Sequence, residues 1–296
     1  MDSRNYQAFL AVAELGSFSK AAEVLFITQP AVSKRIASLE QWLGHQLFDR
    51  AGHSILLNES GRTLLPMAQR IIRDIEESKQ VLANLEGTVS GHLSLVTSHH
   101  IGLRRLPATL QQFNRQYAGI KLDLAFMDSE DACQRIEKGD FEMGIVTLPI
   151  KASGQLKLTP IWQDTLCIAA APDHPLLQQD NVTLADLAEH RAILPSRGTY
   201  TRSIIEGQLV QQQRVLDVVL ETNYLETIRM MVSVGLGWSA LPRTMLANDL
   251  QEVPLKELNM VRTLGLVQHA QRGVSSASRA FIDLLQLAAT HTEKST

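Results

Sequence analysis

The apolar pattern of this 296-residue chain changes its period near residue 90, and this change constrains the fold most strongly. Before it, apolar residues recur at helical spacing. From His92 onward, short apolar runs typical of strands alternate with helical patterns, which favours parallel sheets with crossover helices. Residues 87–91, Gly-Thr-Val-Ser-Gly, lie between the two parts and are a candidate hinge. We therefore expect an α+β multidomain protein, and the length fits about two domains.

The composition is that of an ordinary globular protein, because 45% of the residues are apolar and 20% are charged. The 28 basic and 31 acidic residues give a net charge of −3, so any nucleic-acid function must depend on local geometry rather than on bulk charge. Cys133 and Cys167 lie far apart without a Cys-x-x-Cys motif, which indicates neither a disulfide framework nor a thiolate metal site. No secretory signal or membrane-spanning run is evident, so we expect a cytoplasmic protein.

Three short helices are predicted within the first sixty residues. The first covers Tyr6 to Leu15 and stops at Gly16. Ser17 is placed to cap a second helix, and Thr28 to cap a third. Pro30 falls in the first turn of that third helix, where its missing N–H costs nothing.

The third helix has an apolar stripe on one side and small, polar or basic residues on the others. Lys34 and Arg35 could neutralise phosphates or reach guanine, and small polar groups near the helix N-terminus could approach base edges. The alternative is a three-helix bundle with two exposed cations, which the charge count alone favours, because residues 1–60 hold five basic and six acidic residues. The apolar stripe consists of Val32, Ile36, Leu39 and Leu43.

The order and spacing of these residues favour DNA binding, because they resemble the winged helix-turn-helix of the LysR-type transcriptional regulators. The resemblance implies a helix-turn-helix over Ser17 to Ile36, a recognition helix over Ala31 to Leu43 and wing strands near residues 47–48 and 55–57. The motifs that carry it are SFSKAAEVL at 17–25, TQPAVS at 28–33, Leu39-Glu40, Leu43-Gly44 and LFDR at 47–50.

The resemblance also implies which residues contact DNA. Arg50 at the base of the wing would hold a phosphate. The chain departs from the family at His53, where members often carry arginine, and at Asn58, where they often carry threonine, so wing contacts would be weaker. The predicted DNA-binding residues are Thr28, Gln29, Pro30, Ser33, Lys34, Arg35, Arg50 and His53.

A heptad pattern follows the predicted winged helix-turn-helix. Its apolar residues are separated alternately by four and by three positions, which would form an apolar seam along one side of a helix. Such a seam favours pairing with a second chain, which would present two reading helices to two half-sites. The alternative is a helix that packs on its own domain. Pro66 should end, delay or bend the first turns. The predicted dimerisation residues are Leu64, Ala68, Ile71, Ile75, Leu82 and Leu85.

The remainder of the chain contains alternating strands and helices. Helices are predicted at 106–117, 130–138, 201–212, 224–234 and 278–289. Strands are predicted at 93–97, 120–127, 143–147, 166–171, 192–194, 218–221, 238–241 and 264–268.

Polar side chains follow several predicted strands at the points where those strands end. In such sheets, ligands bind beyond the carboxyl ends of strands, where loops meet helix N-termini. Arg197 could clamp a carboxylate through paired N–H bonds, which favours an anionic metabolite such as an organic or amino acid. Each residue alone could equally be a helix cap. The candidate ligand-binding residues are Ser98, His99, Asp128, Ser129, Thr147, Ser196, Arg197, Gly198, Thr199 and Asn223.

This second part also resembles the effector domain of the LysR-type regulators. The resemblance implies a periplasmic-binding-protein-like α/β domain of two subdomains, and a dimer of dimers (homotetramer) that bends its operator. The expected domains are the winged helix-turn-helix at 1–60, a linker helix at 61–89 and the effector domain at 90–296. Within the effector domain, subdomain I is expected at 90–161 and 268–296, and subdomain II at 162–267.

Catalysis lacks support in the sequence. His99 and His100 are adjacent and cannot present two metal ligands in the i, i+4 manner, and Gly235 and Gly237 form only a fragment of a glycine-rich signature. We therefore predict no catalytic residues, metal or cofactor. The expected protein is a promoter-binding regulator controlled by a small-molecule effector, with RNA polymerase as a further partner. The alternative is a cytosolic small-solute-binding protein or carrier, which leaves the first ninety residues unexplained.

Overall fold

The computed structural model describes residues 2–51, 54–83, 91–151, 153–209, 216–255, 258 and 260–293. The chain divides into two compact units, Met1–Thr88 and Val89–Thr296. Two of the predicted contact residues, His53 and Leu85, lie outside the described residues, as do the side chains of Arg50 and Leu82. In the described ranges, no helix has both the length and the apolar character needed to cross a membrane.

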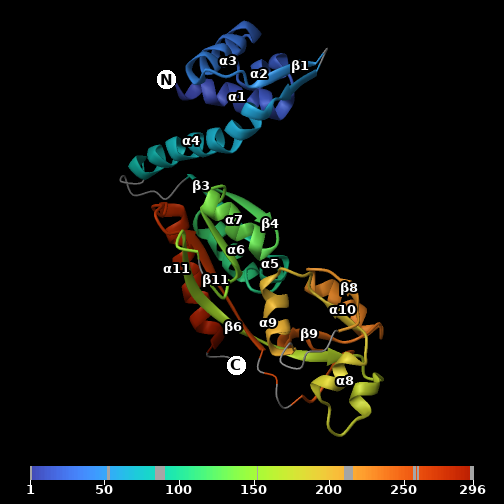
Figure 1. The fold of residues 1–296 in the computed structure, drawn as a ribbon. Coiled ribbons are helices and arrows are strands. Elements are labelled where there is room, and N and C mark those ends of the chain that lie inside the picture. Colours follow the sequence, from blue (N-terminus) through green and yellow to red (C-terminus); the bar gives the residue numbers. More distant parts are fainter. Residues whose placement is uncertain are drawn as a thin grey trace. The chain divides into compact units, whose positions relative to one another are not determined.

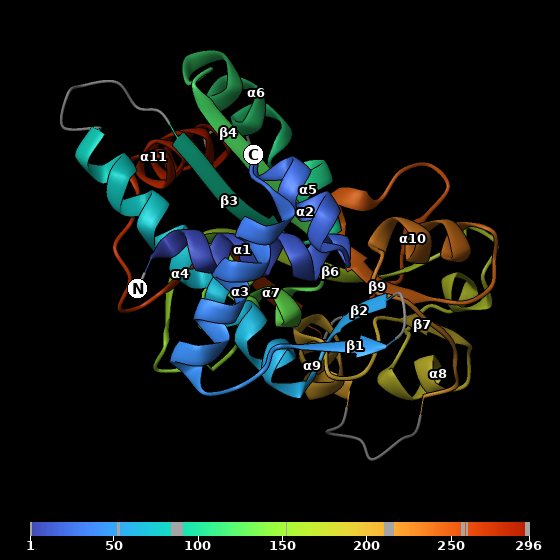
Figure 2. The same ribbon diagram turned by 90° about the horizontal axis from the view of Figure 1, so that it is seen from above.

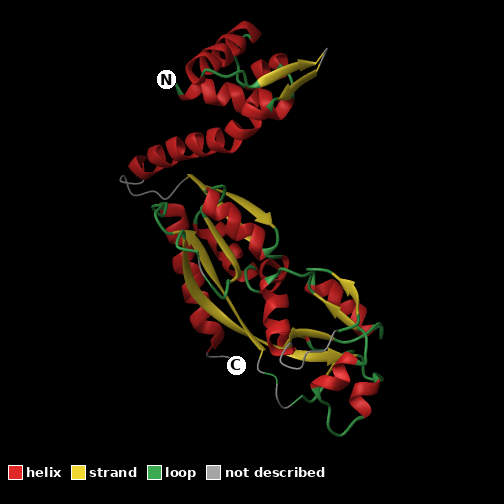
Figure 3. Cartoon of the chain, in the orientation of Figure 1, coloured by secondary structure: helices red, strands yellow, loops and turns green. Residues whose placement is uncertain are grey.

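The first unit is a winged helix-turn-helix followed by a long helix, as predicted (Figure 3). Gly16 ends the first helix at φ 60°, and the Ser17 hydroxyl caps the second by accepting from Lys20 N at 3.3 Å. Thr28 occupies the N-cap of the third helix, but its side chain makes no capping bond, unlike our expectation. The elements are α1 (Ser3–Leu15), α2 (Phe18–Val24), α3 (Gln29–Leu43), β1 (Phe48–Ala51), β2 (Ser54–Leu57) and α4 (Glu59–Ala83).

The core of this unit is formed by the buried sides of its helices. Val32, Ile36 and Leu39 of α3 pack with residues of α1 and α2 in one apolar cluster, as the stripe predicts. The first half of α4 belongs to the same cluster, and the helix continues through Pro66. Gly61 in its first turn has no room for a side chain, since a Cβ there would lie 2.1 Å from the Leu47 carbonyl oxygen.

The second unit contains a seven-stranded sheet and a separate pair of strands. The order of the large sheet is β10-β6-β11-β5-β3-β4, with β9 also paired to β6, and β7 pairs with β8. Its strands are β3 (Gly91–Thr97), β4 (Ile120–Phe126), β5 (Met143–Thr147), β6 (Leu156–Ala170), β7 (Ala192–Leu194), β8 (Val218–Glu221), β9 (Ser239–Pro242), β10 (Gln251–Glu252) and β11 (Met260–His269). The helices are α5 (His99–Arg104), α6 (Pro107–Gln116), α7 (Ser129–Lys138), α8 (Leu184–Ala188), α9 (Tyr200–Leu209), α10 (Leu225–Ser233) and α11 (Ser276–Glu293), with 3-10 turns at Pro175–Gln178 and Arg243–Met245.

These elements form two lobes (Figures 1 and 2). Lobe 1 is built on β3, β4 and β5, with α5, α6, α7 and α11; lobe 2 is built on β7, β8, β9 and β10, with α8, α9 and α10. The long antiparallel strands β6 and β11 pair with each other over ten positions and run through both lobes. Trp162 of β6 is buried in a lobe 1 cluster, whereas Leu166 of the same strand is buried in a lobe 2 cluster.

The two crossing strands differ from our expectation in length. β6 begins at Leu156 instead of residue 166, and β11 begins at Met260 instead of residue 264. Their register shifts between Leu264 and Gly265, and a Cβ at Gly265 would lie 2.3 Å from the Thr159 carbonyl oxygen. Glycine therefore permits the close approach of the two strands at this bulge.

Candidate DNA-reading surface and effector cavity

The amino-terminal part of α3 presents a polar surface. Thr28, Gln29, Pro30 and Lys34 are exposed, and Ser33 and Arg35 are half-buried. The Gln29 amide donates a hydrogen bond to the Ser33 hydroxyl at 3.0 Å, which orders one part of the surface. The predicted DNA-binding residues of α3 thus share one accessible stretch of helix, as a recognition helix requires.

Two acidic side chains of this unit, Asp2 and Glu40, are hydrogen-bonded to other residues. Asp2 caps α1 by accepting from Arg4 N at 3.0 Å and also bonds the Arg4 guanidinium. That guanidinium keeps the pKa of the Asp2 carboxyl below its usual range. Glu40, at the other end of α3, accepts a hydrogen bond from Leu47 N at 2.8 Å. Glu40 is the acidic residue of α3, and its carboxylate is therefore bound to the backbone just before β1.

The predicted dimerisation seam divides into two parts. Ala68 is fully buried inside its own unit, and Leu64 and Ile71 pack against the same core. The alternative, a helix that packs on its own domain, therefore describes the first half of α4. Ile75 is half-exposed and is not part of that cluster. Among the seam residues whose side chains the structure describes, Ile75 is therefore the one available to a second chain.

A second candidate site is a cavity of about 50 Å³ within the second unit. Lobe 1 contributes residues that follow β3 and β4 and the last residue of β5, and lobe 2 contributes residues at the starts of α9 and α10. The lining residues are Ser98, His99, His100, Asp128, Ser129, Glu130, Thr147, Pro195, Thr199, Thr201, Asn223, Leu225 and Arg262.

The structure brings seven of the ten predicted ligand-binding residues together in this lining: Ser98, His99, Asp128, Ser129, Thr147, Thr199 and Asn223. Ser196, Arg197 and Gly198 are not part of it. Arg197 is exposed, so the carboxylate clamp inferred from it has no support in the geometry. The guanidinium that lines the cavity belongs to Arg262 of β11, which sequence reasoning missed because this residue lies inside a strand.

Two sets of hydrogen bonds connect the lobes across the cavity. Asn223 of lobe 2 donates to the Asp128 carboxylate of lobe 1 at 2.6 Å and accepts from Ser196 N at 2.9 Å. The Glu130 carboxylate, in the first turn of α7, accepts from the backbone N–H of Tyr200 at the start of α9. The described conformation is therefore held closed by two carboxylates of lobe 1.

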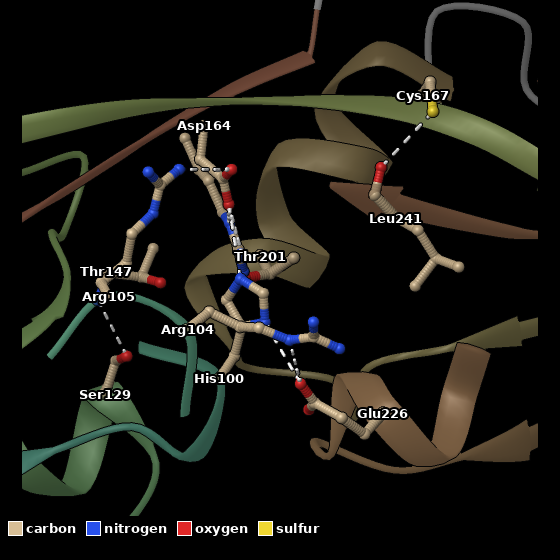
Figure 4. Close-up of polar contacts among 11 residues, drawn as sticks. His100, Arg104, Arg105, Ser129, Thr147, Asp164, Cys167, Thr201, Glu226 and Leu241 are labelled. Atoms are coloured by element: carbon tan, nitrogen blue, oxygen red, sulfur yellow. Dashed lines mark hydrogen bonds and ion pairs between the residues drawn. The ribbon is translucent and has the colours of Figure 1, made fainter. Parts of the chain in front are cut away.

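A network of charged side chains lies beside the cavity (Figure 4). Arg262 of β11 binds the buried Asp164 carboxylate of β6 through Nε at 2.8 Å and Nη2 at 2.6 Å. Arg105 approaches the same carboxylate at 3.6 Å. His100 of α5 lies between Asp164, 4.0 Å from Nε2, and Glu226 of α10, 3.7 Å from Nδ1. The network thus joins both crossing strands to a helix from each lobe.

Burial determines the protonation of this network. Desolvation, assisted by the Arg262 charge, lowers the pKa of His100 to about 4 despite the nearby carboxylates of Asp164 and Glu226. The His100 Nδ1 atom is buried without a hydrogen-bond partner among the described residues. Desolvation also raises the pKa of the Glu130 carboxyl. His100 is therefore neutral at neutral pH, and a positive group beside Glu130 would favour its ionised form.

The two cysteines are free and buried. Burial raises the pKa of the Cys133 thiol and that of the Cys167 thiol each to about 11. Among the described residues, no group of histidine, cysteine, aspartate or glutamate side chains could hold a metal ion.

A winged helix-turn-helix joined to a two-lobed α/β domain with an internal cavity defines the class of ligand-responsive DNA-binding regulators. The family model for bacterial regulatory helix-turn-helix proteins of the lysR family matches residues 3–62, and the model for the LysR substrate binding domain matches residues 86–289. The chain belongs to the LysR family of transcriptional regulators.

Relatives and solved structures agree with this assignment. The uncharacterized HTH-type transcriptional regulator YeiE of Escherichia coli K12 is 31% identical over 285 residues, which cover 95% of each chain. A regulator from the ibpB-leuC intergenic region of Azotobacter vinelandii is 60% identical over 107 residues, covering 36% of this chain and 74% of the relative. The fold resembles full-length CbnR in complex with its target DNA, with a TM-score of 0.70, 20% identity and coverage of 97% and 100%. A small-solute carrier is therefore not favoured.

Proposed function

We propose that this regulator reads promoter DNA with Gln29, Ser33, Lys34 and Arg35 of α3, supported by Thr28 and Pro30. The observation that carries the proposal is the amino-terminal half of α3, which holds no acidic residue and leaves Gln29, Pro30 and Lys34 exposed. CbnR, whose fold is similar, has been solved with its target DNA. From the sequence, Arg50 at the base of the wing is proposed to hold a phosphate. His53 is proposed as a further DNA contact in the wing.

The test removes two positive charges from the proposed reading surface. Lys34→Ala combined with Arg35→Ala should weaken binding to the chain's own promoter fragment, and it should reduce the slope of log K against log salt by up to about 2. The control combines Arg115→Ala with Lys121→Ala, which removes the same charge from exposed positions of the second unit. Anisotropy titrations against promoter and random duplex over a salt series measure both effects. If the two double variants have equal salt slopes, Lys34 and Arg35 do not contact the DNA phosphates.

We further propose that two chains pair through the second half of α4, around Ile75, and that two dimers associate into a tetramer. Ile75→Glu should shift the protein toward smaller species in sedimentation velocity. Gln69→Glu, which adds the same charge on the outer face of α4, serves as the control and should leave association unchanged. A shift caused equally by both variants would contradict a seam through Ile75.

The proposed effector site is the cavity between the lobes. A small molecule bound there would change lobe closure through its different affinity for the open and closed forms, and this change would alter promoter binding. We also propose that the winged helix-turn-helix covers residues 1–60, the linker helix 61–89 and the effector domain 90–296. Within the effector domain, subdomain I would cover 90–161 and 268–296, and subdomain II 162–267. We propose that the chain acts in the cytoplasm, by binding rather than by catalysis, and that RNA polymerase is its further partner at the promoter.

A further inference from the structure

Phe26, in the turn between α2 and α3, has a backbone conformation that is unfavourable for a bulky residue. Its φ angle is 53°, and among the described residues no other non-glycine residue has a positive φ. Left-handed backbone is disfavoured for a residue with a Cβ, because the Cβ crowds the following carbonyl oxygen. Glycines occupy the same conformation after α1 and α3, at Gly16 and Gly44. The chain therefore accepts strain at Phe26 that a glycine would avoid.

Two backbone hydrogen bonds fix this conformation at the end of α2. The N–H of Phe26 donates to the Glu23 carbonyl oxygen at 3.2 Å. The N–H of Ile27 donates to the Ala22 carbonyl oxygen at 3.0 Å. This pair of bonds is the Schellman motif, in which glycine usually occupies the position of Phe26. The turn therefore needs the left-handed backbone but does not need a side chain at this position.

The Phe26 ring does not stabilise the first unit through packing either. Its neighbours Leu25 and Ile27 pack against the apolar core of this unit, whereas Phe26 is not part of that cluster. The residue is 94% exposed, the largest value among the large apolar residues that the structure describes. An exposed apolar residue alone needs no explanation. Full exposure of an aromatic ring on a strained backbone, however, indicates a function outside the fold.

Phe26 adjoins the proposed DNA-reading surface. Thr28, the N-cap residue of α3, follows two positions later, so the Cα atoms of these two residues lie within about 7 Å of each other. No acidic residue occurs from Val24 to Leu39, the stretch that contains both Phe26 and this surface. A polyanion that contacts α3 can therefore extend to the Phe26 ring without meeting a carboxylate of this stretch.

The dimensions of the major groove determine what the ring would meet. The groove is about 12 Å wide, and an α-helix with its side chains is about 10–12 Å across, so one helix fills it. Thr28 makes no side-chain capping bond, which leaves the N-terminus of α3 able to bind a phosphate. A residue just outside this N-terminus then lies at the wall of the groove. There, the deoxyribose rings that join successive phosphates present apolar C–H groups.

We propose that Phe26 is a DNA contact, whose ring packs on a deoxyribose at the wall of the groove that α3 enters. This inference rests on the proposal that α3 reads promoter DNA. The contact is apolar and independent of base sequence, so it should add equally to the affinity for promoter and for random duplex. It displaces no counterions, so it should leave the salt dependence of binding unchanged.

The test removes the ring with Phe26→Gly in the full-length protein. Anisotropy titrations compare the promoter fragment with random duplex over a salt series. Phe26→Gly should weaken binding to both duplexes by about tenfold, with an unchanged slope of log K against log salt. Tenfold corresponds to about 1.4 kcal/mol. Burial of about 55 Å² of apolar surface provides this amount, which is about a third of the area that a phenylalanine can bury.

Two further variants control for the chemistry of the substitution. Phe26→Leu keeps an apolar side chain on the same strained backbone, and it should bind both duplexes within about threefold of the wild type. Ile150→Gly removes a 70% exposed apolar side chain from the second unit, and it should leave binding unchanged.

Hydrogen exchange of the amides in α1, α2 and α3 separates binding from folding. Glycine relieves the strain at this position, although it also gives the unfolded chain more conformational entropy. Phe26→Gly should therefore keep the wild-type protection of these three helices while it loses DNA affinity. Reduced protection in Phe26→Gly would show that the ring stabilises the fold, and it would overturn the inference.

Two binding results would also overturn it. Unchanged affinity of Phe26→Gly for both duplexes would remove the ring from the DNA interface, and a loss on the promoter alone would indicate a base contact instead of a deoxyribose contact. The proposed function fails by a different result, since a wild type that does not prefer the promoter over random duplex refutes it. A wild type with that preference and an unaffected Phe26→Gly refute the Phe26 contact alone.

Discussion

Mild acid should destabilise the second unit through His100. The pKa of this residue is lowered from 6.5 to about 4 in the folded protein, mainly because burial penalises the charged form. In the unfolded chain, His100 takes up a proton as the pH falls through 6.5, whereas the folded protein takes it up only near pH 4. The unfolded state thus binds more protons between these values, so stability is complete above pH 6.5 and declines as the pH falls toward 4.

The size of the effect follows from the separation of the two pKa values. Integrated from pH 7 to pH 5, the shift lowers the free energy of unfolding by about 2 kcal/mol through His100 alone. Carboxylates titrate in the same range, so the comparison is made with His100→Gln, which keeps a polar side chain but does not titrate. The variant should therefore lose about 2 kcal/mol less than the wild type between these pH values.

Urea unfolding followed by tryptophan fluorescence is a suitable assay. Trp162 and Trp238, both in the second unit, are buried, whereas Trp42 in the first unit is 64% exposed. Most of the signal change should therefore report the unit that contains His100. If the wild type and His100→Gln lose the same stability between pH 7 and pH 5, Asp164 and Glu226 stabilise the imidazolium as strongly as burial opposes it, and the argument fails.

Three further predictions concern packing and thiol reactivity. Gly265→Val should destabilise the second unit by more than about 3 kcal/mol in urea unfolding, because a side chain there collides with the Thr159 carbonyl oxygen; a mild effect would mean that the bulge can relax. Trp238→Phe should cost about 2 kcal/mol, since it removes a buried indole N–H that donates to the carbonyl oxygens of Leu187 at 2.9 Å and His190 at 3.2 Å; unchanged unfolding would contradict this. Cys133 and Cys167 should react with a thiol reagent at pH 8 only after unfolding, because burial raises both pKa values to about 11; rapid labelling of the native protein would refute this.

The head was predictable from sequence because its determinants are local. Gly16 and Ser17 mark a helix end and a helix start within two residues, and the stripe through Val32 and Ile36 lies on one helix. Each signal depends on neighbours within a few turns. The same reasoning placed Asp128 and Thr147 at strand ends, where the cavity lies, because the end of a strand is visible in the sequence as a change of period.

The parts that were missed depend on contacts between distant residues. Arg262 and Asp164 are separated by 98 positions and meet only because β6 and β11 pair. His100 and the helix α5 were not predicted, because six residues are too few to show a helical period. Arg197 lies in the predicted loop, yet its side chain is exposed, since chain position does not determine the direction of a loop side chain. Sequence therefore located the cavity better than it identified the charges inside it.

The position of the Asp164–Arg262 pair suggests how a ligand could act on the lobes. Arg262 lines the cavity and belongs to β11, whereas Asp164 belongs to β6, so the ion pair joins the two strands that connect the lobes. His100 and Glu226 extend this network to α5 of lobe 1 and α10 of lobe 2. A ligand that draws Asp128 or Glu130 away from its partner in the other lobe removes a bond that holds the lobes together. The effect of the ligand on closure equals the difference between its binding free energies for the two forms.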